Sequence, residues 1–252
     1  MNKSKIEWCD YTWNPVTGCL HNCTYCYARR IANRFGDKTD GVCDEWHDLH
    51  TPFYKMNGRL NPYPYSFAPT FHRYRLDEPQ KIKKPSKIFV CSMADLFGDW
   101  VPDEWIEEVF KICIIKAPHH KYLFLTKNPA RYLQILKSQY PLCDYQNMWF
   151  GFTHTEGELW GLPAHMQINR FVSIEPLLGE VYPSPFFWED GIDWVIIGSE
   201  TGNRKDKVIP KREWIENIVS ECREHNIPVF MKNSLKDLMG NDFIQEWPEG
   251  LK

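Results

Sequence analysis

Three cysteines in one short segment are the residues of this sequence that point most directly to chemistry. Cys19, Cys23 and Cys26 form a C-x3-C-x2-C pattern within TWNPVTGCLHNCTYCYARR. Thiolates are the ligands that iron–sulfur clusters require, and close spacing lets one loop bring three sulfurs to one small object. A cubane held by three cysteines keeps one iron open, which is what metal chemistry on a substrate needs.

A structural zinc site is the alternative interpretation of this segment. Such a site needs four ligands, and His21, Cys9 or Cys43 could complete it. The sequence has no second C-x2-C knuckle, which favours the cluster over zinc. A non-catalytic zinc-binding interaction module therefore remains the alternative to an enzyme.

The cysteine pattern resembles the signature of the radical S-adenosylmethionine (SAM) superfamily, with Tyr25 at the aromatic position before the third cysteine. The resemblance extends over roughly residues 8–233 to a phage- and prophage-borne family with few characterised members. The segments of this sequence that carry the resemblance are TWNPVTGC, PTFHRYRLDEP, SMADLFGDW, FLTKNPARY, SIEPLLG and VIIGSETG.

The resemblance implies a partial (βα)6 TIM-like barrel, a 4Fe–4S cluster on Cys19, Cys23 and Cys26, and S-adenosyl-L-methionine as co-substrate. One electron, from a reductant such as flavodoxin or ferredoxin, would cleave SAM to a 5′-deoxyadenosyl radical that abstracts hydrogen from the substrate. The superfamily often has Gly-Gly-Glu after its second strand, to hold the SAM amino group. Here residues 92–95 read SMAD, so Asp95 is the candidate replacement. Tyr25 is expected near the adenine.

The elements that must position these residues alternate between apolar strands and amphipathic helices. Such alternation predicts an α/β fold with a parallel sheet, whose chemistry lies at the carboxyl ends of the strands. The predicted strands are 87–93, 121–127, 148–154, 168–174, 193–199 and 227–233. The predicted helices are 24–35, ending at Gly36, then 102–116, 128–138 and 210–225.

Polar residues follow these strands where an active site is expected, and a charge at a barrel mouth is costly unless it is paired or ligand-bound. We predict four catalytic residues: Lys127, Glu175, Glu200 and Lys232. We predict six cofactor-binding residues: Tyr25, Ser92, Asp95, Thr126, Thr153 and Ser199. Helix capping or mutual pairing is the structural alternative for any single one of them.

Residues 37–86 interrupt the alternation and are predicted to be one long insertion, a lid or substrate-binding segment. Residues 37–48 are acidic, whereas residues 53–87 are basic and rich in tyrosine and phenylalanine. Cations interleaved with aromatic rings are typical of surfaces for single-stranded or flipped-out nucleotides. The sequence thus favours a nucleotide or a modified base in phage DNA as substrate. A peptide or small metabolite, and a solvated lid without substrate contact, are the alternatives.

The composition of the chain excludes some classes of protein. The 252 residues carry a formal net charge of −3, which argues against a protein that coats nucleic acid through its overall charge. Nine cysteines without a signal peptide predict reduced thiols. With no long apolar run, we expect no membrane association and a cytoplasmic location, in a phage-infected or prophage-carrying bacterium. A single domain over 1–252 is expected.

Overall fold

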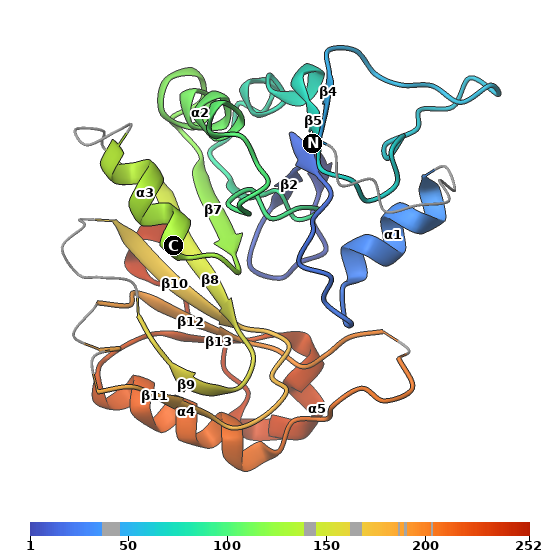
Figure 1. Cartoon of the computed structure of the whole chain (residues 1–252). Helices are drawn as coiled ribbons and strands as arrows, with labels where there is room; N and C mark the ends of the chain where they lie inside the picture. The colour runs from blue at the N-terminus through green and yellow to red at the C-terminus, as the bar shows by residue number, and fades with distance from the viewer. Residues whose placement is uncertain (37–45, 139–144, 162–167, 186, 189–190, 203) are drawn as a thin grey trace. The chain divides into compact units, whose positions relative to one another are not determined.

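The six apolar segments predicted as strands are strands in the structure (Figure 1). The computed structural model of the chain describes residues 1–36, 46–138, 145–161, 168–185, 187–188, 191–202 and 204–252. The six strands are β6 (Lys87–Val90), β7 (Lys121–Thr126), β8 (Met148–His154), β10 (Asn169–Ile174), β12 (Trp194–Ile197) and β13 (Val229–Met231). Most of their side chains are buried, as parallel strands covered on both faces require.

The chain divides into two compact units, Met1–Asn147 and Met148–Lys252. In the first unit β2 (Tyr11–Trp13), β6 and β7 run parallel, and β1 (Asn2–Lys3) pairs antiparallel with β2. In the second unit β8, β10, β12 and β13 run parallel in that order. Both units therefore have a parallel-rich sheet, which confirms the mixed α/β class.

The four predicted helices are also present, with small changes at their ends. They are α1 (Tyr27–Phe35), α2 (Asp103–Lys111, continued by a π-helix over Ile112–Lys116), α3 (Ala130–Ser138) and α4 (Arg212–Glu224). A fifth helix, α5, spans Lys236–Met239. Within the described ranges, no helix has the length and apolar character needed to cross a membrane.

The described part of the insertion is more structured than the predicted single loop. Strand β5 (Thr70–His72) pairs antiparallel with β3 (Val16–Thr17) and parallel with β4 (His47–Leu49). Arg75 donates to the carbonyl of Asn14, and the Trp13 indole donates to the carbonyl of Arg75. The insertion is thereby attached to the chain that leads into the cysteine loop. Residues 37–45, with their acidic side chains and Cys43, lie outside the described residues.

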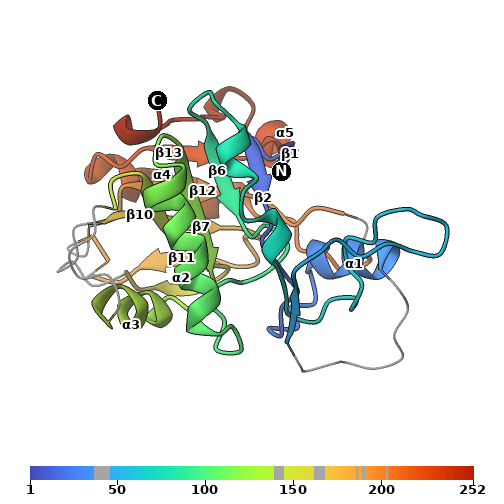
Figure 2. The same cartoon turned by 90° about the horizontal axis from the view of Figure 1, so that it is seen from above.

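The remaining short elements complete the two units (Figure 2). In the second unit β9 (Gly157–Leu159) and β11 (Val181–Pro183) form a separate parallel pair. Turns of 3-10 helix lie at Arg73–Arg75, Pro79–Lys81, Asn233–Leu235, Gly240–Asp242 and Glu249–Leu251.

Candidate functional site

The cysteine loop begins with a glycine that no other residue can replace without strain. Gly18 has φ of +88°, and a Cβ at this position would lie 2.1 Å from the Ala68 carbonyl oxygen. The Gly18 amide donates to the Met93 carbonyl at 2.9 Å, and the Cys19 amide donates to the Phe67 carbonyl at 3.2 Å. The start of the loop is therefore fixed by the insertion and by the segment after β6.

The loop ends where α1 begins, and its third cysteine is the helix cap. The Cys26 sulfur accepts from the Arg29 amide at 3.3 Å, and the Cys26 amide donates to the Cys23 carbonyl at 3.2 Å. This cap explains why α1 starts at Tyr27, three residues later than predicted. Ala28 and Ala32, one turn apart, pack with Phe67 and Met93, and the small side chains let the helix approach closely.

The three loop thiols differ from the other described cysteines in their exposure. Cys19, Cys23 and Cys26 are free and partly accessible, whereas the other described cysteines are buried: Cys9, Cys91, Cys113 and Cys222. Cys43 and Cys143 lie outside the described residues. The three accessible sulfurs thus form a donor set that suits an iron–sulfur cluster.

The pKa of the Cys19 thiol is raised to about 12, mainly by burial. A hydrogen bond from the His21 backbone lowers it in part, and the negative charges of Asp95, Cys26 and Cys23 contribute to the rise. The loop sulfurs are therefore close enough to oppose one another's ionisation. Among the described residues, no group of three His, Cys, Asp or Glu side chains is arranged to hold a single metal ion. A cubane offers a different iron to each thiolate, so its ligands need not meet at one point.

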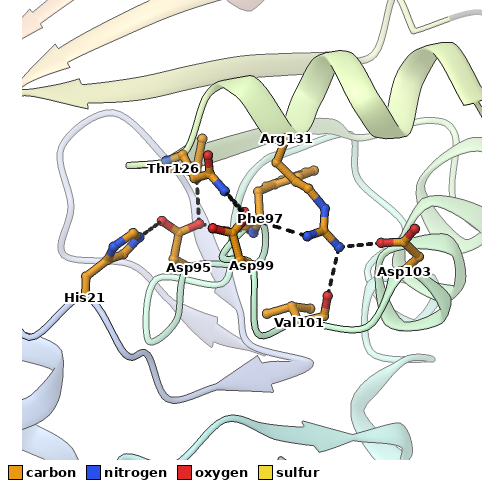
Figure 3. Close-up of polar contacts among 9 residues, drawn as sticks. His21, Asp95, Phe97, Asp99, Val101, Asp103, Thr126 and Arg131 are labelled. Carbon is orange, nitrogen blue, oxygen red and sulfur yellow. Dashed lines mark hydrogen bonds and ion pairs between the residues drawn. The ribbon is translucent and has the colours of Figure 1, made fainter.

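Asp95 is the centre of a buried polar cluster that joins the cysteine loop to the ends of β6 and β7 (Figure 3). Its Oδ1 accepts from the Thr126 hydroxyl at 2.7 Å and from the Phe97 amide at 3.1 Å. Its Oδ2 accepts from the Lys127 amide at 2.8 Å and lies 2.8 Å from His21 Nε2. An ionised carboxylate only accepts, so the imidazole is the donor in this pair.

The loop that carries Asp95 is fixed at its other end by Arg131 of α3 (Figure 3). Arg131 donates to the Val101 carbonyl at 3.0 Å and forms an ion pair with Asp103. The Trp100 ring packs edge-on against the His21 ring, with centroids 4.8 Å apart. His21 is thus held by both a carboxylate and an indole.

Two tyrosines beside the cysteines contact predicted site residues. The Lys127 amine donates to the Tyr25 hydroxyl at 3.1 Å and lies 5.3 Å from the centre of the Tyr25 ring. The Tyr27 hydroxyl donates to the Ser92 carbonyl at 2.7 Å. The structure therefore brings Tyr25, Ser92, Thr126 and Lys127 together with Asp95 and the cysteines, in one region of the first unit.

The other predicted site residues belong to the second unit, and the following contacts lie within that unit. The Lys232 amine, after β13, donates to Glu175 Oε1, after β10, at 2.5 Å. Gly198 leaves room for this pair, since a Cβ there would lie 3.0 Å from Lys232 Cδ and 3.1 Å from Glu175 Cδ.

Three further predicted residues lie near the end of β8 or just after β12 in this unit. Glu200 is buried and accepts two hydrogen bonds of 2.7 Å from Arg204. Ser199 donates its amide to the Ser234 hydroxyl at 3.2 Å. Thr153 pairs with Ser173 across β8 and β10. Two predicted residues, Glu175 and Lys232, therefore pair with each other, which is the structural alternative in a different combination from the couple of Lys127 with Glu175 that the sequence suggests. Glu200 pairs with Arg204, which is not among the predicted residues.

Sequence reasoning missed two residues of the first unit. The sequence indicates His21 only as a possible zinc ligand, whereas in the structure its ring forms a hydrogen bond with Asp95. Asn14, which was not singled out, accepts through Oδ1 from the Ser92 hydroxyl at 3.1 Å and the Met93 amide at 3.0 Å. A signal for Asn14 exists in the sequence, because it follows the apolar Trp13 directly and precedes a proline.

Comparison with known proteins identifies a family, but no activity is described for that family. A family model described as "Protein of unknown function (DUF5131)" matches residues 3–237. Neither the curated proteins nor the solved structures provide a match.

Proposed function

We propose that this chain, which belongs to the DUF5131 family of proteins of unknown function, is a radical SAM enzyme acting on a nucleotide or a base in nucleic acid. One observation carries the proposal: three free, partly accessible thiols at C-x3-C-x2-C spacing occupy one loop that is fixed at both ends. The proposal includes a partial (βα)6 barrel as the finer architecture of the parallel-rich fold.

Cys19, Cys23 and Cys26 would hold the 4Fe–4S cluster, each through one thiolate. Bound beside it, S-adenosylmethionine would supply, on one-electron reduction, the 5′-deoxyadenosyl radical that removes a hydrogen atom from the substrate. The residues of the chain itself would position these two groups and the substrate.

The residues around the loop hold and orient it. Asp95 keeps His21, and with it the middle of the loop, against the end of β7. Lys127 supplies a positive charge beside the loop, suited to a carboxylate, and the Tyr25 ring offers a face for an adenine. The catalytic roles of Glu175, Glu200 and Lys232, and the cofactor contacts of Thr153 and Ser199, stay predictions.

Anaerobic reconstitution with iron and sulfide tests the proposal. We expect about four irons and four sulfides per chain, and 5′-deoxyadenosine on addition of SAM with dithionite or reduced flavodoxin. Cys23→Ala should lose both the cluster and SAM cleavage. Cys9→Ala, which removes a buried thiol outside the motif, is the matched control and should keep both.

Two results would contradict the proposal. The first is stoichiometric zinc in protein that forms no 5′-deoxyadenosine. The second is undiminished SAM cleavage by Cys23→Ala.

A further inference from the structure

The structure separates the basic stretch 53–87 into parts with different roles. Arg73 is held by Asp48 and Glu108, and Arg75 donates to two backbone carbonyls. Four lysines lie at the amino end of β6, the opposite end from Asp95: Lys81, Lys83, Lys84 and Lys87. These cations are therefore not the ones placed to receive a ligand near the cysteine loop.

The remaining part, residues 53–61, forms a hairpin that projects from the first unit. The Asn61 amide donates to the Phe53 carbonyl, and the Lys55 amide donates to the Arg59 carbonyl, both at 2.8 Å. Tyr54 and Leu60 pair antiparallel between them. Asn61 is fully buried and anchors the base. Figures 1 and 2 both show the segment between β4 and β5 reaching outward on the side of α1.

Exposed aromatic rings lie together with cations on this hairpin and on α1; three of the four cations are exposed and Lys55 is half-buried. We define the basic-aromatic surface as Tyr27, Arg30, Arg34 and Phe35 of α1, with Phe53, Tyr54, Lys55 and Arg59 of the hairpin. All four rings are more than 40% exposed. The sequence has no Asp or Glu within 27–36 or 49–76, in a chain of net charge −3. This surface is locally positive on an overall negative protein.

The two halves of the surface share one support. Helix α1 packs on residues 63–67, the segment that follows the hairpin, through Ala32 and Phe67. The Ser66 hydroxyl also donates to Asn33 of α1 at 3.0 Å. Because α1 starts directly after Cys26 and is about 13 Å long, a ligand lying along it extends to the cysteine loop.

We propose that the basic-aromatic surface binds a single-stranded polynucleotide, and so guides a base toward the cysteine loop. A polynucleotide presents both phosphates and flat bases, and this surface presents cations close to aromatic rings; the Arg34 guanidinium, for example, lies 5.3 Å from the centre of the Phe35 ring. The link to catalysis depends on the proposed function, whereas the binding itself does not.

Fluorescence anisotropy with labelled 20-mers of thymidylate and uridylate, on the full chain purified anaerobically, tests this surface. Two charge reversals, Lys55→Glu with Arg59→Glu, should weaken binding at least tenfold and lower the salt slope by about 1.4, at about 0.7 per phosphate contact. Tyr54→Ala should weaken binding about 5- to 150-fold if its ring stacks on a base. The control, Lys83→Glu with Lys84→Glu, makes the same charge change elsewhere and should stay within about threefold of wild type.

The proposal is supported if either oligonucleotide binds to wild type and the hairpin variants, but not the control, weaken that binding. The oligonucleotide that binds more tightly shows whether the surface prefers deoxyribose or ribose. Equal losses in both double variants, or no binding of either oligonucleotide, would overturn it. Photo-crosslinking of a 5-iodouracil 20-mer to wild-type protein gives an answer without any variant, because crosslinks confined to segments other than 27–35 and 53–61 refute the surface.

Iron content and 5′-deoxyadenosine are measured on the same preparations. Hairpin-dependent binding without a cluster would therefore reject the proposed function and retain the surface.

Discussion

Replacing Asp95 by asparagine should destabilise the first unit far more than the size of the change suggests. The Asp95 side chain is 7% exposed, and its carboxylate accepts four hydrogen bonds, two on each oxygen. An amide can present its oxygen to only one of these two pairs. Its NH2 group then faces a backbone N–H, either that of Phe97 or that of Lys127, and neither amide can turn away.

The magnitude follows from counting these bonds. A hydrogen bond to a charged group contributes about 1.5–3 kcal/mol, and one between neutral groups about half as much. Asp95→Asn loses one backbone bond outright and converts the others to neutral ones, although the Thr126 hydroxyl and His21 imidazole can reorient. We expect a loss of about 3 kcal/mol, or a melting temperature lower by about 6–12 °C.

The matched control is Asp99→Asn in the same loop. The Asp99 side chain is 86% exposed, and its partners are Asn128 at 2.7 Å and Arg131 at 3.8 Å. Exposed pairs of this kind contribute less than about 1 kcal/mol. Thermal unfolding followed by tryptophan fluorescence measures both variants. If Asp95→Asn lost no more stability than Asp99→Asn, the buried four-bond cluster would not exist as described.

Three further predictions concern the loop and its support. Compared as cluster-free chains, Cys26→Ser and wild type should melt within about 2 °C of each other, because serine is a good helix cap. After reconstitution the variant should lack the cluster iron in a colorimetric assay, and retained iron would remove Cys26 from the ligand set. Gly18→Ala should cost more than about 3 kcal/mol in urea unfolding because its Cβ meets a carbonyl, whereas Gly58→Ala, at a φ of +76° with open space, should cost only about 1 kcal/mol; equal costs would contradict the tight entry to the loop. Burial lowers the pKa of His72 to about 2, so below its ordinary value of 6.5 the unfolded chain takes up a proton that the folded chain refuses. The free energy of unfolding should therefore fall by up to about 1.4 kcal/mol more per pH unit in wild type than in His72→Gln as pH drops from 6.5 to 4.5, and parallel pH curves would show that His72 is not buried neutral.

The sequence predicted the elements whose signal is local. Six buried strands were predicted because each is a short run of aliphatic and aromatic residues. Strand β2 was missed because its three residues, Tyr11–Trp13, are too few to show a period. The start of α1 was placed too early because a cysteine cap is not among the usual capping residues.

The site was predictable only in part, because its contacts join distant positions. The cysteine spacing can be read within eight residues, but Asp95 meets His21 across 74 positions and Thr126 across 31. Strand ends placed Asp95 and Thr126 in the same region, and no rule of periodicity states which of them bond. The insertion, likewise, could not be divided into its buried base and its exposed hairpin without knowing that Arg73 meets Asp48 and Glu108.

Both carboxylate oxygens of Asp95 already accept two hydrogen bonds each, and this affects whether Asp95 can also bind SAM. The sequence suggested that Asp95 takes the place of a carboxylate that holds the SAM amino group. An ammonium would have to displace a donor from an oxygen that already accepts two hydrogen bonds, and two of the four donors are backbone amides that would then be buried without a partner. Because that exchange is costly, the geometry favours Asp95 as a positioning residue. It holds His21 at the centre of the cysteine loop, and partners of a bound amino group are better sought among the carbonyls and hydroxyls around Ser92.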